Sequence, residues 1–360
     1  MAKSEFSKLE ETYLGFINPD FTIKVGQKTV QKDFAIVDLK VKMSAAYDIG
    51  SCEFTVAGIM DLEEGEIRKE VLSTFKTGEV VVVEVGYTSN LQGVFKGYIN
   101  SLAYEFSGQG PAITVECLDA KGALVNNKTW VNFGKKDIKE IVTSILNEKC
   151  KDYADIGTIE SDFDAGEEGA YDESPEIKKD VDDYQYLKAF AERTNNSFCV
   201  IYDKIHFCKN LADTAEVGIK LEWGRHLLTF SMEHDISQQI GAVEVYGMDH
   251  IEHKTFSGKA TNTDQVPKVV KNKVIMINDP KGVVNEGQAT ALAKHTLAAH
   301  QTRFMTCKGS TIGLPDLKAG DKVEIGGMGE GLNGTYYLTY VTHSINGGGY
   351  LTSFEGSRPV

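Results

Sequence analysis

The sequence has few prolines, no CxxC cysteine pair and no long apolar run, and each absence excludes a class of protein. Only 7 prolines and no low-complexity stretch occur, so domains strung on flexible linkers are not expected. The 6 cysteines are scattered through a chain too large to need disulfide staples, which predicts reduced thiols in semi-buried positions. The N-terminus carries charges throughout and lacks a signal-peptide core, and no later window resembles a membrane span. We therefore expect synthesis in the cytoplasm and no membrane segment.

Positive charge is also scarce. The formal net charge is −14 and the isoelectric point is near 5.1. Binding to nucleic acid requires Lys and Arg to displace the counterions of the phosphates. The composition therefore predicts no nucleic-acid partner, and a length of 360 residues predicts two or three domains.

Motifs for catalysis and for phosphate binding are missing. No GxSxG or HExxH pattern occurs, and no GxxxxGK[ST] or GxGxxG loop opens a helix. Carboxylates abound in so acidic a chain, and no pair is spaced in a way that identifies an acid and a nucleophile. The sequence thus predicts a protein that is not an enzyme and holds no cofactor.

One acidic loop, from Glu160 to Glu176, invites a metal hypothesis. Asp162, Asp164 and Glu173 occupy positions one, three and twelve of an EF-hand-like pattern, where calcium takes oxygen ligands. Position six, which needs glycine for a sharp turn, is a glutamate. A solvated acidic loop is therefore the preferred interpretation, with calcium binding as the alternative.

A second metal hypothesis concerns the segment SFCVIYDKIHFC. If Asp203 and Lys204 form a two-residue turn, Cys199 lies opposite Cys208 and shares a face with His206. Three soft ligands on one hairpin could begin a zinc site, but no fourth ligand has the right spacing. We expect these side chains to pack in a core and assign no metal-binding residue.

The main positive signal is an internal repeat of strand-turn-strand character. Residues 78–102 and 320–345 each open with glycine and an acid, Gly78-Glu79 and Gly320-Asp321. Each block then passes through a Leu-polar-Gly turn into an aromatic-rich run, and the two motifs keep their spacing to within one residue. This pattern predicts a duplicated β module.

Periodicity predicts the remaining elements. Residues 34–43 alternate, with Val37, Leu39, Val41 and Met43 on the face opposite to Asp38, Lys40 and Lys42, as in a half-buried strand. Apolar residues at helical spacing predict helices at 135–149, 180–193 and 285–300.

We predict a mainly β (α+β) fold with two related small β-barrel domains and an inserted α/β domain. The predicted boundaries are 1–125 for the first barrel, completed by 219–237, then 126–218 for the insertion and 219–360 for the second barrel with one helix.

Three segments together resemble a known family. They are GRHLLTFSMEHDISQQIGAVEVYG at 224–247, the helix-then-hairpin run DDYQYLKAFAERTNNSFCVIYDKIHFC at 182–208, and residues 317–354 with Leu-x-x-Gly-Asp-x-Val and a closing YLTSF. They are similar to the phage late control D family and to the hub part of VgrG proteins. The resemblance implies the central hub of a contractile tail or injection-system baseplate, related to the T4-type hub.

The resemblance also implies partners. Two tube domains per chain in a homotrimer would connect a hexameric tail tube to a threefold spike, within a particle assembled after synthesis in a bacterial cytoplasm. VgrG proteins continue into a spike, whereas this sequence stops at Val360, so a separate spike protein is expected beside tube and baseplate proteins. Asp38, Lys40, Lys42, Lys322 and Glu324 are the candidate lumen or interface residues. A tail-associated peptidoglycan hydrolase and a monomeric β-barrel ligand-binding module are the alternative functions.

Overall fold

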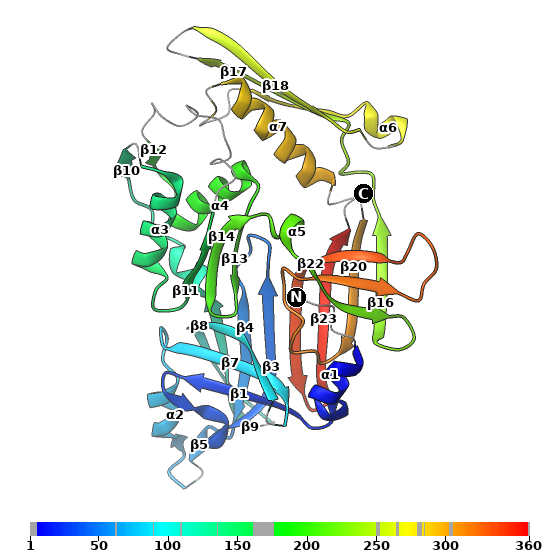
Figure 1. The fold of residues 1–360 in the computed structure, drawn as a ribbon. Coiled ribbons are helices and arrows are strands. Elements are labelled where there is room, and N and C mark those ends of the chain that lie inside the picture. The colour runs from blue at the N-terminus through cyan, green and yellow to red at the C-terminus, as the bar shows by residue number, and fades with distance from the viewer. Residues whose placement is uncertain are drawn as a thin grey trace.

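The predicted mainly β fold is confirmed by the computed structural model (Figure 1). The structure describes the whole chain except residues 1–5, 62, 89, 109, 135, 161–175, 250–252, 264–265, 279–282, 284, 302–304 and 359–360. The acidic loop with Asp162, Asp164 and Glu173 thus lies outside the described residues. No helix of the described part is long and apolar enough to cross a bilayer.

A 13-stranded sheet forms the body of the molecule. Its strands lie in the order β16 (Leu227–His234), β20 (Met305–Ile312), β23 (Gly349–Arg358), β22 (Gly334–Asn346), β3 (Ala35–Ser44), β4 (Ser51–Ala57), β9 (Gly110–Asp119), β8 (Asn90–Ser107), β7 (Val80–Tyr87), β1 (Pro19–Val25) and β2 (Lys28–Thr29), with β15 (Val217–Glu222) and β21 (Lys322–Gly326) off this path.

The large sheet consists of two related halves that meet at one strand pair. In the first half β3, β4, β9 and β8 are neighbours, and in the second half β16, β20, β23 and β22 are neighbours in the same order. The antiparallel pairing of β22 with β3 joins the halves. One continuous core fills both halves, from Val81 and Val115 in the first to Val323 and Leu338 in the second.

Short elements close the ends of the halves. They are α1 (Phe6–Thr12), η1 (Leu14–Phe16), η2 (Val30–Lys32), β5 (Met60–Asp61), β6 (Glu66–Ile67), α2 (Lys69–Thr74) and η3 (Ala120–Leu124).

An α/β unit with its own core follows β9. It contains β10 (Val131–Gly134), α3 (Ile138–Lys149), β11 (Asp155–Ile159), β12 (Glu176–Lys178), α4 (Asp183–Thr194), β13 (Asn196–Ile201), β14 (Lys204–Lys209) and α5 (Leu211–Thr214). Asp137 and Asp182 accept hydrogen bonds from the first-turn amides of α3 and α4, which explains where these helices begin. The helices predicted at 135–149 and 180–193 are confirmed.

A third unit interrupts the second half between β16 and β20. Its strands β17 (Ala242–Asp249), β18 (Lys254–Thr261) and β19 (Val274–Asn278) form one sheet, with α6 (Lys268–Lys271) beside it and α7 (Glu286–Gln301) against one face. The Asn285 side chain accepts a 2.9 Å hydrogen bond from the Gln288 amide, which caps the start of α7. In Figure 1 this unit lies at the upper end of the molecule, and the α/β unit lies below it at the left.

Two predicted registers are wrong. The β13–β14 pairing sets Ile201 opposite Lys204, so the turn is Tyr202-Asp203 and Cys199 lies opposite His206. Tyr202 takes a left-handed φ of 54°, and its ring lies directly over Gly93 of β8, where a Cβ atom would come within 2.3 Å. This tertiary contact selects the turn.

The second wrong register concerns β3. Val37 is 51% exposed instead of sharing the buried face of Leu39. The β3–β4 pairing shifts between Ile36 and Leu39, and such a bulge reverses which face of the sheet the following side chains point to. In addition, β15 and β16 pair with β21 and β20 of the second half.

Candidate assembly surface

One face of the large sheet is polar and exposed. On β3, Leu39, Val41 and Met43 are buried in the core, while Asp38, Lys40 and Lys42 point to the other face and are exposed. Side chains alternate along a strand, so each strand of the sheet has a core face and an outer face.

The strand registers carry this polar face into the second half. Lys42 lies opposite Thr342 on β22, which lies opposite Ser353 on β23. Ser353 lies opposite Ser310 on β20, and Ser310 opposite Thr229 on β16. Hydroxyl groups thus form a continuous row across four strands next to Lys42.

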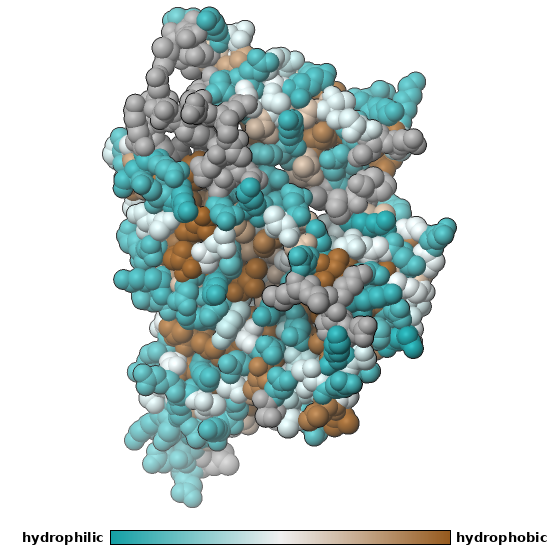
Figure 2. Space-filling model, in the orientation of Figure 1, coloured by the Kyte–Doolittle hydropathy of each residue, from teal (hydrophilic) through white to brown (hydrophobic). Residues whose placement is uncertain are grey.

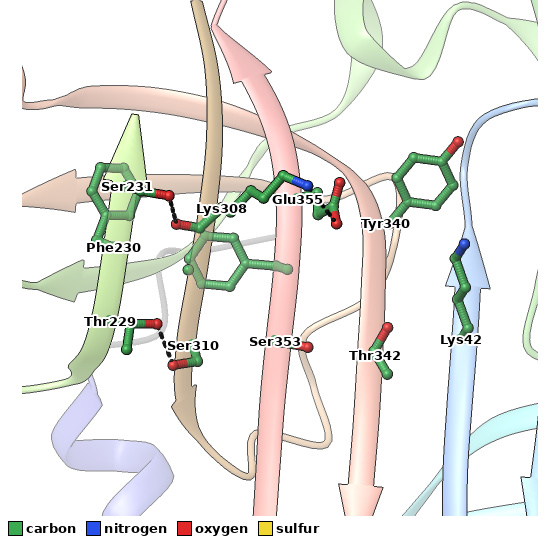
Figure 3. A pocket seen from close by; sticks show the side chains of 12 residues that line it. Lys42, Thr229, Phe230, Ser231, Lys308, Ser310, Tyr340, Thr342, Ser353 and Glu355 are labelled. Atoms are coloured by element: carbon green, nitrogen blue, oxygen red, sulfur yellow. Dashed lines mark hydrogen bonds and ion pairs between the residues drawn. The ribbon is translucent and has the colours of Figure 1, made fainter. Parts of the chain in front are cut away.

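A groove of about 330 Å³ follows this row (Figure 3). The Thr229 and Ser310 hydroxyls are 2.6 Å apart, and the Lys308 ammonium lies 3.2 Å from the Glu355 carboxylate. The Lys42 ammonium sits 4.8 Å from the centre of the Tyr340 ring. No histidine or cysteine lines the groove. The groove is a polar surface whose charged side chains have partners in the protein. It offers no nucleophile beside a base, so nothing in it suggests catalysis.

The other two candidate residues lie elsewhere. Lys322 and Glu324 are on β21, which pairs with β15 and β22. The Glu324 carboxylate lies 3.7 Å from the ammonium of Lys220, a half-exposed pair that adds little stability. The structure therefore gathers Asp38, Lys40 and Lys42 on one strand and separates Lys322 and Glu324 from them.

The repeated glycine-acid motif has the same geometry in both halves. The amide of Gly78 donates to the carbonyl of Ile99 at 2.8 Å, and the amide of Ile99 donates to the carbonyl of Glu79 at 3.0 Å. Gly320 makes the same reciprocal pair with Leu338, at 2.8 and 2.9 Å through Asp321. Gly78 and Gly320 both have a positive φ, of 88° and 95°. The predicted duplication is confirmed.

A shared β-bulge shows the duplication residue by residue. The β8–β9 register shifts after Ile99 and resumes at Ser101, and the β22–β23 register shifts after Leu338 and resumes at Tyr340. From this bulge the rows can be followed across each half. In the first half the successive partners are Ile99, Cys117, Cys52 and Val41, and in the second Leu338, Gly356, Cys307 and Met232.

The proposed soft-metal cluster is a packing cluster. Cys199 and Cys208 are buried free thiols, and burial raises their pKa values to about 12 and about 11. His206 accepts a 3.1 Å hydrogen bond from the Thr158 amide, and burial lowers its pKa. Within the described ranges no group of three His, Cys, Asp or Glu side chains is placed to hold a metal ion. Cys199 and Cys208 thus pack in the core, as expected, whereas His206 is partly buried.

Sequence reasoning missed the residues that distinguish the edges of the two halves. Tyr104 and Phe106 on β8 are 38% and 65% exposed, although large aromatic side chains are normally buried. Their structural equivalents on β22 are His343 and Ile345, which are 1% and 9% exposed. These equivalent residues are identified by counting forward from the bulge that β8 and β22 share. The sequence alone does not reveal this bulge.

Comparison with known proteins agrees with this architecture. The family model described as the Alg8 N-terminal domain matches residues 18–347. No curated protein matches the chain.

Among solved structures, a tail protein from Neisseria meningitidis MC58 superimposes with a TM-score of 0.71 at 13% identity, over 95% of this chain and 97% of that one. The 43 kDa tail protein of prophage MuSo2 from Shewanella oneidensis gives a TM-score of 0.70 at 14% identity, over 95% and 99%. An E. coli type VI secretion component, described as similar to the T4 tail proteins gp27 and gp5, gives 0.59 at 12% identity, over 95% of this chain and 77% of that one. The chain therefore has the fold of phage tail proteins and VgrG-type hubs, as its sequence predicted.

Proposed function

We propose that this chain, which belongs to the Alg8 N-terminal domain family, is the structural hub of a contractile tail or injection-system baseplate. In this role three copies form a ring that joins a hexameric tail tube to a threefold spike. The protein acts by assembly and not by catalysis, and its partners are tube, spike and baseplate proteins. It is made in the bacterial cytoplasm and built into the particle. The predicted division at residues 125 and 218 is retained within this proposal.

The observation that carries the proposal is the duplication inside the large sheet. Each chain has two four-strand halves in the same order, with matching bulges and matching glycine-acid hydrogen bonds. Three chains then present six similar units around one axis. A threefold object with six similar units is a simple solution to a symmetry mismatch between a hexamer and a trimer.

The two ends of the molecule support a direction for this adapter. The β8–β9 and β22–β23 turns are equivalent, since Gly110 and Gly349 begin the return strands with φ of 102° and 112°. Strands β9 and β23 begin at the lower end in Figure 1, whereas the β17–β19 unit, present once per chain, lies at the upper end, with the α/β unit below it at the left. The lower end fits the hexameric tube, and the upper end fits the threefold spike.

The polar sheet face fits the wall of the central channel. Asp38, Lys40 and Lys42 lie on it, together with the hydroxyl row that ends at Thr229. A channel wall of serine and threonine hydroxyls and paired charges should bind passing molecules weakly, because it presents no large apolar surface. Lys322 and Glu324 remain candidates for the outer interface of β21.

Native mass spectrometry of the purified chain, at increasing concentration, tests the proposal. We expect a species of three copies of the 39.6 kDa chain. A strictly monomeric chain at every concentration, also when co-expressed with tube and spike proteins from its own gene neighbourhood, would refute the hub.

A further inference from the structure

A lysine, an aspartate and an asparagine meet inside the α/β unit. Lys178 ends β12 and is 1% exposed, and Asp183 begins α4 and is 4% exposed. The Lys178 ammonium donates a hydrogen bond to Oδ1 of Asp183, and the Asn127 side-chain amide donates one to Oδ2 of the same carboxylate. The ammonium also donates a 3.3 Å hydrogen bond to the main-chain carbonyl of Asn127. One buried carboxylate therefore holds an amine nitrogen beside a side-chain amide.

A buried ion pair by itself accounts for only part of this arrangement. A lysine is almost never fully buried unless a partner offsets its charge, and Asp183 supplies that partner for Lys178. Lys121, which is also fully buried, donates instead to the main-chain carbonyls of residues 46–48. At Lys178 the carboxylate also binds the side-chain amide of a third residue, Asn127, which ion pairing does not require.

We infer that the side chains of Lys178 and Asn127 become joined by an amide bond, with Asp183 carrying the protons. An amine attacks an amide only as the neutral base. Transfer of a proton from an ammonium to a carboxylate produces two neutral groups, and a site shielded from water favours neutral groups over charged ones. Asp183 contacts both nitrogens that change their protonation, so it is placed to act first as the base and then as the acid.

The bonds and protons of this step balance without any further reactant. Asp183 takes one proton from the Lys178 ammonium, and the neutral Nζ attacks Cγ of Asn127. The bond from Cγ to Nδ2 then breaks while Asp183 passes the proton to Nδ2. Nζ loses a second proton, which leaves with Nδ2 as ammonium, and Asp183 is again a carboxylate. The products are one secondary amide and one ammonium ion.

The bond would close a covalent loop around the first elements of the α/β unit. Residues 127 and 178 are 51 positions apart, and the chain between them contains β10, α3 and β11. In the folded chain β12 already pairs with β10, so the two ends of the loop lie together (Figure 1). A cross-link of this kind stabilises a fold by restricting the unfolded chain. The inference concerns a single chain and does not depend on the proposed hub.

The intact mass of the purified full-length chain, held at pH 7 until the mass is constant, tests the bond. Loss of ammonia should lower the mass by about 17 Da relative to the sequence, and proteolysis should yield one branched peptide that joins Asn127 to Lys178. The variant K178R keeps a cation beside Asp183, but a guanidinium stays protonated and does not attack, so this variant should keep its full mass. D183N removes the proton carrier and should also keep its full mass.

K259R is the matched control, because Lys259 forms a largely exposed ion pair with Glu244 in another sheet and should retain the loss of mass. Circular dichroism shows which variants fold, and the branched peptide of the unchanged chain decides the question even if a variant does not. Cyclisation at an Asn-Gly sequence such as Asn333-Gly334 also releases ammonia, and that loss would persist in K178R.

Three results would overturn the inferred bond. They are an unchanged chain of full mass, a loss of mass that persists in K178R, and a link from Lys178 to Asp183 with loss of water, about 18 Da.

Discussion

The Tyr87 hydroxyl donates a buried 2.8 Å hydrogen bond to the carbonyl oxygen of Gly313. Tyr87 lies on β7 in the first half, and Gly313 follows β20 in the second half, so this bond connects the two halves at one end of their shared core. The Tyr87 ring also packs 5.6 Å from the Tyr350 ring, measured between centroids.

Replacing Tyr87 by Phe should therefore destabilise the chain while leaving its packing intact. Loss of one buried hydrogen bond costs about 1 kcal/mol. Urea unfolding followed by circular dichroism measures this change. Y104F is the matched control, because Tyr104 is 38% exposed, and equal stabilities for Y87F and the unchanged chain would contradict the prediction.

Gly93 should not tolerate alanine. A Cβ at this position would lie 2.3 Å from the Tyr202 ring, and overpacking of this kind costs about 1–3 kcal/mol. The midpoint of urea unfolding should fall for G93A, and the effect should shrink in a Tyr202→Ala background. G108A is the control, since no atom lies within 4 Å of its added methyl group. An equal effect of G93A in both backgrounds would show that Tyr202 is not the cause.

His343 should make the fold sensitive to acid. The ring is buried, its Nε2–H donates a 3.1 Å hydrogen bond to the Leu317 carbonyl, and its Nδ1 accepts a 2.9 Å hydrogen bond from the Tyr350 hydroxyl. Burial lowers the pKa of His343 from 6.5 to about 4. Between about pH 4 and pH 6.5, the unfolded chain binds a proton at His343 while the folded chain does not. Stability should therefore fall as the pH drops from about 6.5 to about 4, by up to about 3 kcal/mol at 1.36 kcal/mol per unit.

The variant H343Q removes the titratable side chain. Its free energy of unfolding should therefore change less between about pH 6.5 and pH 4, even if its stability at pH 7 is lower. Urea unfolding at a series of pH values measures the slope. The exposed His253, replaced by Asn, provides the comparison and should keep the slope of the unchanged chain. If H343Q and the unchanged chain lose stability in parallel, His343 does not control the acid response.

Phe106→Asp should weaken assembly without unfolding the chain. The side chain is 65% exposed in the single chain, so a carboxylate there meets water. Burying a phenylalanine at an interface contributes about 1.5–3 kcal/mol, which corresponds to a roughly 10- to 100-fold weaker association. Analytical ultracentrifugation measures this change. M276D is the control, because Met276 is 59% exposed on the β17–β19 unit, in a different sheet from Phe106. Equal weakening by both variants would indicate a general charge effect.

Local periodicity was sufficient for the helices and for most strands. The apolar spacing of α3, α4 and α7 and their caps are properties of neighbouring residues, and the structure places these helices within a few residues of the predictions. The repeated glycine-acid motif likewise identified two equivalent hairpins, because a positive φ and a following β-branched run leave a readable pattern.

Contacts between distant segments decided the rest. The sequence by itself determined a duplicated, mainly β protein with polar and apolar strand faces. Only the tertiary structure decided the Tyr202-Asp203 turn, because a ring from the α/β unit rests on Gly93 of a strand far away in the chain. The tertiary structure likewise paired β22 with β3, which joins the two halves of the large sheet. Strand pairing depends on backbone hydrogen bonds that every residue except proline can form, so side-chain patterns specify a strand's faces but not its neighbours.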